Sequence, residues 1–122
     1  MPSKSVADVL DDLQRNILLA KLFVEGMSFE QFSQDQKSVY AVIRALEIIS
    51  EASRRLPEEV TKRHPSIPWR AIAGAGNVYR HDYQDLTHDM IWRTVTESLN
   101  ALESVVAAEI TALGQGNNGS GG

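Results

Sequence analysis

The sequence contains no cysteine among its 122 residues, which excludes disulfide bonds and thiolate zinc sites. No apolar run approaches the ~20 residues that a helix needs to cross a bilayer. Residues 1–5, Met-Pro-Ser-Lys-Ser, lack the apolar stretch of a signal peptide. These absences predict a cytoplasmic protein that has no membrane partner.

Several motifs of enzyme chemistry are also missing. The chain has no Gly-x-x-x-x-Gly-Lys phosphate loop, no Gly-x-Ser-x-Gly elbow and no His-Glu-x-x-His zinc motif. The histidines, His64, His81 and His88, do not have the spacing of helical metal ligands. We therefore expect neither a metal site nor a cofactor.

Positive charge is unevenly distributed in this acidic chain, whose formal net charge is −4. Residues 54–81 carry six of the twelve Arg and Lys residues and only two acids, so this segment is +4 and the remainder is −8. Such a zone can approach a phosphate backbone or an acidic partner. Arg54, Arg55 and Arg70 are the candidates for RNA or partner binding; the alternative is that they are solvated surface residues.

Apolar residues recur every three or four positions through most of the chain, and no segment alternates as a strand does. One helix is predicted from Ser5, and the capping signature Ser28–Gln31 predicts a short turn after it. A further helix is predicted from near Ser33 or Asp35 to Pro57, a third segment from Pro68, and a last long helix from Thr87. Trp69 and Trp92 are expected to be core or interface anchors rather than platforms for RNA bases.

This pattern predicts an all-α fold, an antiparallel helical bundle with three long helices and shorter ones between them. Residues 1–113 are expected to form one helical domain. Residues 114–122 are Gly, Asn, Ser and Gln only, a composition that predicts a disordered tail. Two of the long helices have apolar faces broad enough to serve a second copy, so a homodimer is a hypothesis.

The stretch from Gly74 to Tyr83 is the densest cluster of polar and titratable side chains. His81 can transfer protons near neutral pH, Arg80 is a fixed cation suited to phosphate, and Asp82 could orient the imidazole or cap the next element. Asn77, four residues before His81, would face the same way on a helix. The alternative, which spacing alone favours, is a helix C-terminus whose cations offset the dipole.

Two blocks of the sequence resemble a known family. Residues 40–52, Tyr-Ala-Val-Ile-Arg-Ala-Leu-Glu-Ile-Ile-Ser-Glu-Ala, are similar to a block in which Gly-Glu-Ala follows an apolar helix. Residues 67–77, Ile-Pro-Trp-Arg-Ala-Ile-Ala-Gly-Ala-Gly-Asn, together with the following His81-Asp82-Tyr83, are similar to a second block. The family is the HepT-like group of HEPN-domain proteins, and the resemblance covers roughly residues 8–113.

The resemblance implies an all-helical dimer that is the toxin of a toxin–antitoxin pair. The antitoxin partner would be a minimal nucleotidyltransferase. Active members of the family are metal-independent ribonucleases with an Arg-x4-His motif, whose site forms where two subunits meet. In some members the motif extends to Arg-x4-His-x-Tyr, and the partner AMPylates the Tyr and so blocks the toxin.

Position by position, the resemblance matches His81 to the motif His, Tyr83 to the modified Tyr, and Asn77 to the Asn that commonly follows the motif Arg. The motif Arg itself falls at position 76, which is Gly76 in this chain. Losing that charge could cost several kcal/mol of transition-state stabilisation. Arg80 lies about a turn away, and we expect it to point differently.

Two readings follow. In the first, the protein is an endoribonuclease toxin in which His81 is the acid/base and Arg80 takes over the phosphate role. In the second, the motif is degenerate at Gly76 and the protein binds its nucleotidyltransferase without cleaving RNA. Ser50 stands where the family usually has Gly, which we interpret as a packing variation, and Glu51 is expected near the site.

Overall fold

A computed structural model describes residues 5–81 and 87–121, and the side chains of residues 5–79 and 87–115. The described residues are helical and contain no strand, which confirms the predicted all-α class. In chain order the elements are α1 (Val6–Phe23), α2 (Phe29–Gln34), α3 (Gln36–Arg54), α4 (Glu58–Thr61), α5 (Trp69–His81), α6 (His88–Arg93), the π-helical turn η2 (Thr94–Ser98) and α7 (Leu99–Gly121).

Local signals in the sequence set the ends of the first helices. The Ser5 hydroxyl accepts a hydrogen bond from the Asp8 amide and so caps α1. After α1 the chain turns at Gly26, whose φ of +77° favours glycine. Ser28 and Gln31 then form a capping box in which each side chain binds the other residue's amide, so α2 starts where the sequence predicts.

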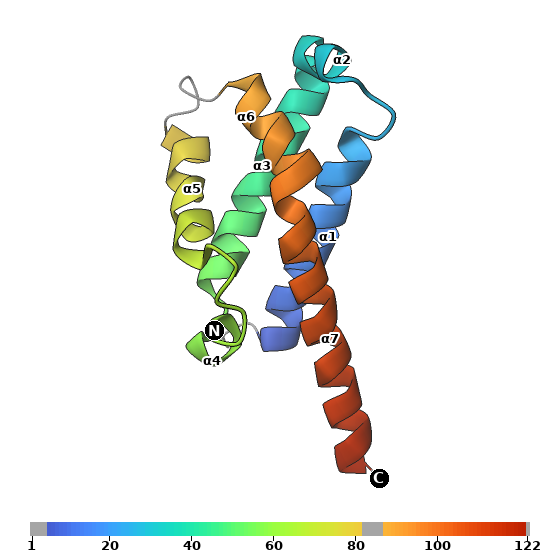
Figure 1. Cartoon of the computed structure of the whole chain (residues 1–122), viewed down its shortest axis with the longest axis vertical. Coiled ribbons are helices and arrows are strands. Elements are labelled where there is room, and N and C mark those ends of the chain that lie inside the picture. The colour runs from blue at the N-terminus through green and yellow to red at the C-terminus, as the bar shows by residue number, and fades with distance from the viewer. Residues whose placement is uncertain (1–4, 82–86, 122) are drawn as a thin grey trace.

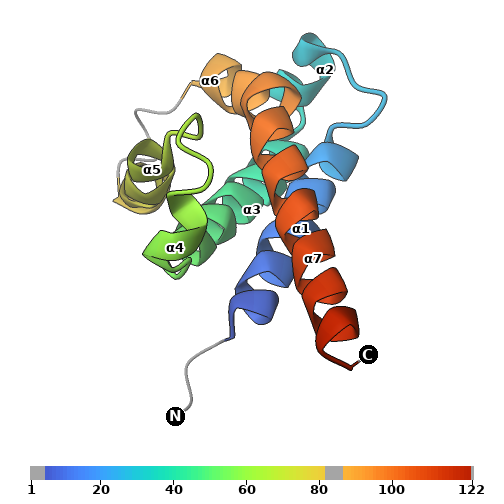
Figure 2. The same ribbon diagram turned by 60° about the horizontal axis from the view of Figure 1, so that its bottom comes forward.

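Helix α3 lies at the centre of the bundle and packs against α1 on one side and α5 on the other (Figure 1). Helix α7 packs along α1, and α4 and α5 lie together beside α3 (Figure 2). The apolar stripes of α1 and α3 meet in the core. The buried residues of these two stripes are Val9, Leu10, Leu13, Ile17, Ala20, Val39, Val42, Ile43, Ala45, Leu46, Ile49 and Ala52.

Two prolines delimit the connection from α3 to α5. Pro57 follows the end of α3 and precedes α4, and Pro68 directly precedes α5. The Trp69 indole N–H donates to the His64 carbonyl oxygen at 2.9 Å and fixes the start of α5. Trp69 is half-buried against the core, as expected for an anchor.

The predicted last helix is interrupted. Thr87 caps α6 as expected, but the segment that follows is the π-helical turn η2 and not a continuous α-helix. Buried residues stand four apart at Ile91, Val95 and Leu99. In an α-helix each step of four drifts by about 40° around the axis, so the wider π turn keeps these side chains on the core side.

The other tryptophan joins α2 to α6. Its ring packs against Phe32 at a centroid distance of 5.4 Å and against Phe29 at 6.0 Å. Phe32 is fully buried, so Trp92 is a core anchor, as predicted. Farther along, the Lys21 ammonium ties α1 to α7, because it lies 2.6 Å from both Asn100 Oδ1 and Glu103 Oε1.

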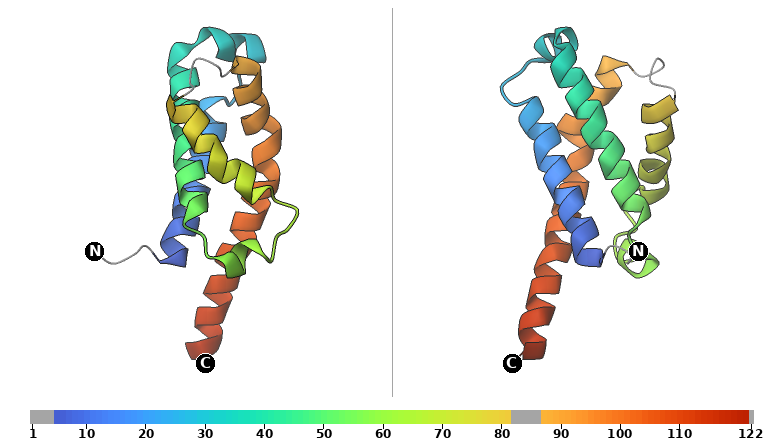
Figure 3. Two further views of the ribbon diagram at one scale, coloured as in Figure 1. Left: turned by 90° about the vertical axis from the view of Figure 1, so that its left-hand side faces the viewer. Right: turned by 180° about the vertical axis from the view of Figure 1, so that it is seen from behind.

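The last turns of α7 extend past the ends of α1 and α3 (Figure 3). Helix α7 reaches Gly121, so its backbone includes most of the Gly/Asn/Ser segment from residue 114. The disorder predicted for that segment in solution, and the homodimer, stay predictions. Within the described ranges, no helix combines the length and the hydropathy that a membrane span requires.

Candidate functional site

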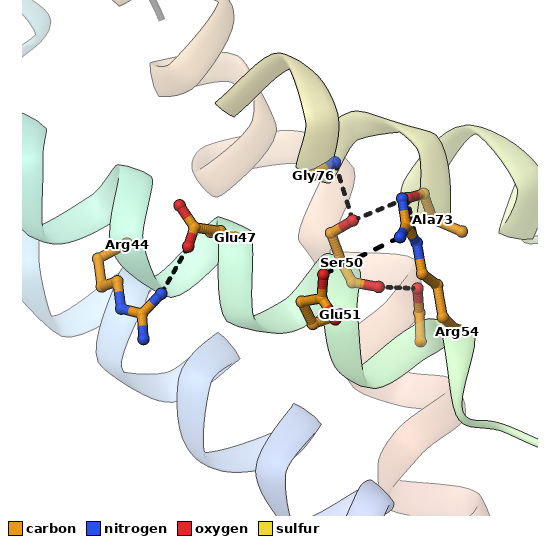
Figure 4. Close-up of polar contacts among 8 residues, drawn as sticks. Arg44, Glu47, Ser50, Glu51, Arg54, Ala73 and Gly76 are labelled. Atoms are coloured by element: carbon orange, nitrogen blue, oxygen red, sulfur yellow. Dashed lines mark hydrogen bonds and ion pairs between the residues drawn. The ribbon is translucent and has the colours of Figure 1, made fainter. Parts of the chain in front are cut away.

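The contact between α3 and α5 contains a buried hydroxyl bridge. Ser50 Oγ donates to the Ala73 carbonyl oxygen at 3.0 Å and accepts from the Gly76 amide at 2.9 Å (Figure 4). Only 1% of Ser50 is exposed, so water does not compete with these bonds. Ser53 Oγ in turn donates to the Ser50 carbonyl oxygen at 2.7 Å. Ser50 is therefore a polar link between two helices, which the interpretation as a packing variation missed.

An arginine supports the same carbonyl group. Arg54 Nε donates to the Ala73 carbonyl oxygen at 2.9 Å, and Arg54 Nη1 lies 3.9 Å from Glu51 Oε1 (Figure 4). More than a third of the Arg54 side chain is exposed. Arg54 therefore holds α5 against α3 and still presents part of its guanidinium to solvent. Glu51 lies at this contact, and its expected place near the site stays a prediction.

Position 76 is part of the helix contact. Gly76 is buried and its amide points to Ser50 on α3. Because α5 is helical through His81, positions 76 and 80 lie one turn apart on the same side of the helix. The direction of the Arg80 side chain lies outside the described set, so the expectation that it points differently from position 76 stays a prediction.

The next pair of positions, Asn77 and His81, is turned by about 100° around the helix and also lies one turn apart. Asn77 is exposed, so this side of α5 faces solvent. The side chains of Arg80 and His81 lie outside the described set, and Asp82 and Tyr83 lie outside the described residues. Their roles as catalytic, supporting and modified residues stay predictions.

The two remaining cationic candidates are both exposed. Arg55 follows α3 as its C-cap, and Arg70 lies in the first turn of α5. No acid pairs with either of them among the side chains of residues 5–79 and 87–115. They remain candidates for binding a negatively charged partner.

The other histidines are engaged away from α5. His88 Nδ1 lies 2.8 Å from Ser33 Oγ, which joins α6 to α2. His64 Nε2 lies 2.6 Å from Glu109 Oε2, which joins the end of the α4 segment to α7. Among the described residues there is no group of three or more His, Cys, Asp or Glu side chains that could hold a metal ion.

Glu109 is the strongest ionic centre that the sequence did not reveal. The residue is 7% exposed, and its carboxylate accepts two hydrogen bonds from Arg63, at 2.7 and 3.2 Å, beside the contact with His64. The Arg63 guanidinium, with help from His64, lowers the pKa of Glu109 to about 2, against the opposing effect of burial. The sequence gives one indication of this ionic centre, a Glu within the apolar stripe of α7. It does not indicate the partners of Glu109, because they are 45 or more residues away.

A cavity of about 210 Å³ lies on the other side of α5, between α3 and the η2–α7 segment. Its lining is mainly apolar and includes Leu46, Ile72, Ala75 and Leu102. Tyr79 lines one side of it, and burial raises the pKa of the Tyr79 hydroxyl above its ordinary value, although a hydrogen bond with Thr94 acts in the opposite direction. The cavity leaves α5 less tightly packed on this side than at the Ser50 bridge.

Comparisons with known proteins agree on one family. Residues 13–109 match the family model described as "HepT-like: Ribonuclease HepT-like". The chain is 39% identical over 100 residues to the probable ribonuclease HepT of Thermococcus cleftensis, covering 82% of this chain and 91% of that one. It is 36% identical over 95 residues, 78% of each chain, to a protein of Methanocaldococcus jannaschii whose name proposes that it is an RNase. No solved structure matches the chain significantly.

Proposed function

The chain belongs to the HepT-like ribonuclease family, and from this premise we propose that it cleaves RNA, without a metal ion, at the C-terminal end of α5. One observation carries the proposal. Helix α5 is continuous through His81, so position 81 stands one helical turn beyond the exposed Asn77. A histidine at such a position can reach a large substrate that does not enter the protein.

The proposed reaction is an intramolecular transesterification. His81 takes the proton from an RNA 2′-hydroxyl, and the 2′-oxygen attacks the adjacent phosphorus. The bond to the 5′-oxygen breaks, that oxygen takes a proton from water as it leaves, and the His81 imidazolium returns its proton to the solvent. The products are a 2′,3′-cyclic phosphate and a 5′-hydroxyl. Arg80 neutralises the charge that develops on the phosphoryl oxygens, in place of the motif Arg.

A second candidate function is favoured by the place of Gly76. Its amide is bound to Ser50 and its Cα is buried against α3, so position 76 offers no cation to a phosphate. In this reading the protein binds a nucleotidyltransferase partner and does not cleave RNA. The two candidates differ in whether Arg80 supplies the missing charge.

The finer parts of the proposal concern assembly and control. They are a homodimer, a location in the cytoplasm, and a role as the toxin of a toxin–antitoxin pair. A minimal nucleotidyltransferase would be the antitoxin and would transfer AMP from ATP to the Tyr83 hydroxyl with release of pyrophosphate. A mass increase of one AMP on the wild type, and none on Tyr83→Phe, would support this control.

The test of the main proposal is cleavage of a labelled RNA by the purified protein in excess EDTA. We expect 2′,3′-cyclic phosphate ends, no cleavage of the 2′-deoxy substrate, and a loss of at least 100-fold in rate for His81→Ala. Arg80→Ala should lose a similar factor if it holds the phosphate. RNA that stays intact with the wild-type protein would contradict the ribonuclease proposal, and a stable complex with the nucleotidyltransferase would then favour the second candidate.

A further inference from the structure

The exposed side of α5 carries a row of positions that leads to His81. Arg70, Gly74, Asn77 and His81 are spaced by four, three and four residues. At 100° per residue these positions fall within an arc of about 60° around the helix axis. They therefore form one straight row along the helix, which we call the α5 row.

The α5 row is open to solvent along the part whose side chains are described. Arg70, Gly74 and Asn77 are all exposed, whereas Ile72, Ala75 and Tyr79 on the other side of the helix are half-buried against the core. A Cβ built on Gly74 would meet no atom within 4 Å. The middle of the row is therefore low and unobstructed, and an extended chain could lie along it.

The charge along the α5 row is positive. The sequence of α5 contains no Asp or Glu. Arg70 has no acidic partner among the described side chains, so its charge is available at the start of the row. Arg54 flanks the row from α3, because its Nε is bound to the Ala73 carbonyl oxygen. Glu51, 3.9 Å from Arg54, offsets part of that second charge, which makes Arg70 the stronger phosphate site.

The length of the row fits a short stretch of single-stranded RNA. Eleven residues separate Arg70 from His81, which corresponds to about 16 Å at 1.5 Å per residue. An extended single strand covers this distance in about two or three nucleotides. A phosphate at Arg70 would thus belong to the same strand as a phosphate at His81.

We propose that single-stranded RNA lies along the α5 row, and that Arg70 binds a backbone phosphate two or three nucleotides away from the one at His81. This inference rests on the proposed function for the nature of the ligand, and it adds a second contact that a dinucleotide cannot reach. With this contact the affinity of the protein would depend on the length of the strand and not on its base sequence.

Binding to non-cleavable 2′-O-methyl oligonucleotides tests the inference separately from cleavage. Fluorescence anisotropy would compare a dinucleotide with a hexanucleotide over a series of salt concentrations. For Arg70→Ala we expect a five- to tenfold weaker affinity for the hexanucleotide and no change for the dinucleotide. The slope of log affinity against log salt should fall in magnitude by about 0.7, the value for one phosphate contact on a single strand. The matched control is Arg15→Ala, an exposed arginine on α1 that should leave both affinities unchanged.

A second variant guards against an effect of folding. Gly74→Leu replaces a helix-interior glycine at a place with free space, so it should raise the melting temperature while its side chain obstructs the row. We expect this variant to lower the affinity for the hexanucleotide and to leave the affinity for the dinucleotide unchanged. The inference is overturned if Arg70→Ala leaves the salt slope unchanged, if it weakens both oligonucleotides equally, or if neither oligonucleotide binds. Length-dependent binding through Arg70 without any cleavage would support the inference and contradict the ribonuclease proposal alone.

Discussion

Ser50 Oγ on α3 and the Gly76 amide on α5 lie 2.9 Å apart, and the same hydroxyl donates to the Ala73 carbonyl oxygen one turn earlier. A single buried hydroxyl thus fixes the position of α5 along the axis of α3 (Figure 4). By the resemblance drawn from the sequence, both residues stand where the family usually has a different residue. The two departures are therefore one contact, and they should behave as a unit when they are changed.

Removal of the bridging hydroxyl should destabilise the protein. Ser50→Ala removes the hydroxyl that binds the Ala73 carbonyl oxygen and the Gly76 amide at a buried site. We expect the free energy of unfolding to fall by about 1–3 kcal/mol. Urea denaturation measures it. Ser104→Ala is the control, because that exposed hydroxyl bonds only within its own helix, and it should change the free energy by less than about 0.5 kcal/mol. Equal losses in the two variants would contradict the bridge.

Restoring the family arginine should depend on position 50. Gly76→Arg forces a long side chain out of a buried contact beside Ser50, so alone it should lower stability. In the double variant Ser50→Gly/Gly76→Arg the space of the hydroxyl is free, and we expect a favourable coupling energy of at least about 0.5 kcal/mol. A double-mutant cycle by denaturation measures this coupling, and strict additivity would show that the two positions are independent. Assaying RNA cleavage by the same double variant tests whether the family charge raises activity.

The Glu109 cluster should make the stability sensitive to acid. The pKa of Glu109 is lowered in the folded state to about 2 from 4.5, so its contribution is present above pH 4.5 and is lost as the pH falls toward 2. Because Arg63 is half exposed, we expect roughly 2–3 kcal/mol rather than more. Glu109→Gln should lose this amount at pH 7 and flatten the stability curve between pH 4.5 and 2. Glu58→Gln, which breaks only the exposed pair with Lys62, should leave the curve unchanged.

Filling the cavity beside α5 should stabilise the protein. Ala75→Leu places three more carbon atoms in an apolar space of about 210 Å³. We expect a gain of about 1 kcal/mol in the free energy of unfolding, seen as a higher melting temperature by calorimetry. Ala108→Leu on the exposed side of α7 is the matched control and should have little effect. A lower melting temperature for Ala75→Leu would mean that the cavity cannot accept the side chain in an unstrained rotamer.

The features that the sequence predicts correctly depend on neighbours along the chain. Ser5, Ser28 and Thr87 cap helices because each side chain binds an amide three residues later, and Pro68 precedes α5 because it needs no amide partner there. The apolar spacing then predicts which faces of α1 and α3 are buried. These signals are local, so no knowledge of the fold is needed to read them.

The features that the sequence does not predict depend on distant pairs. Ser50 meets Gly76 across 26 residues, and Glu109 meets Arg63 across 46. Nothing in the composition of residues 94–98 marks a π turn, since that turn is set by which faces must reach α1 and α2. The predictions for the candidate site are neither confirmed nor contradicted by the structure, because its decisive side chains follow position 79. The experiments above test them.

The π turn η2 also has a consequence for how this helix can change in evolution. A π turn holds one more residue than the α turn that it replaces. The helix therefore carries one extra residue between the part that contacts α2 and the part that contacts α1. Loss of one exposed residue there, such as Thr96, would convert the turn to ordinary α-helix with little loss of buried surface. The same deletion in α7 would rotate Leu102 and Val106 away from the core, so this is the one stretch where the helix can shorten by a residue and keep its partners.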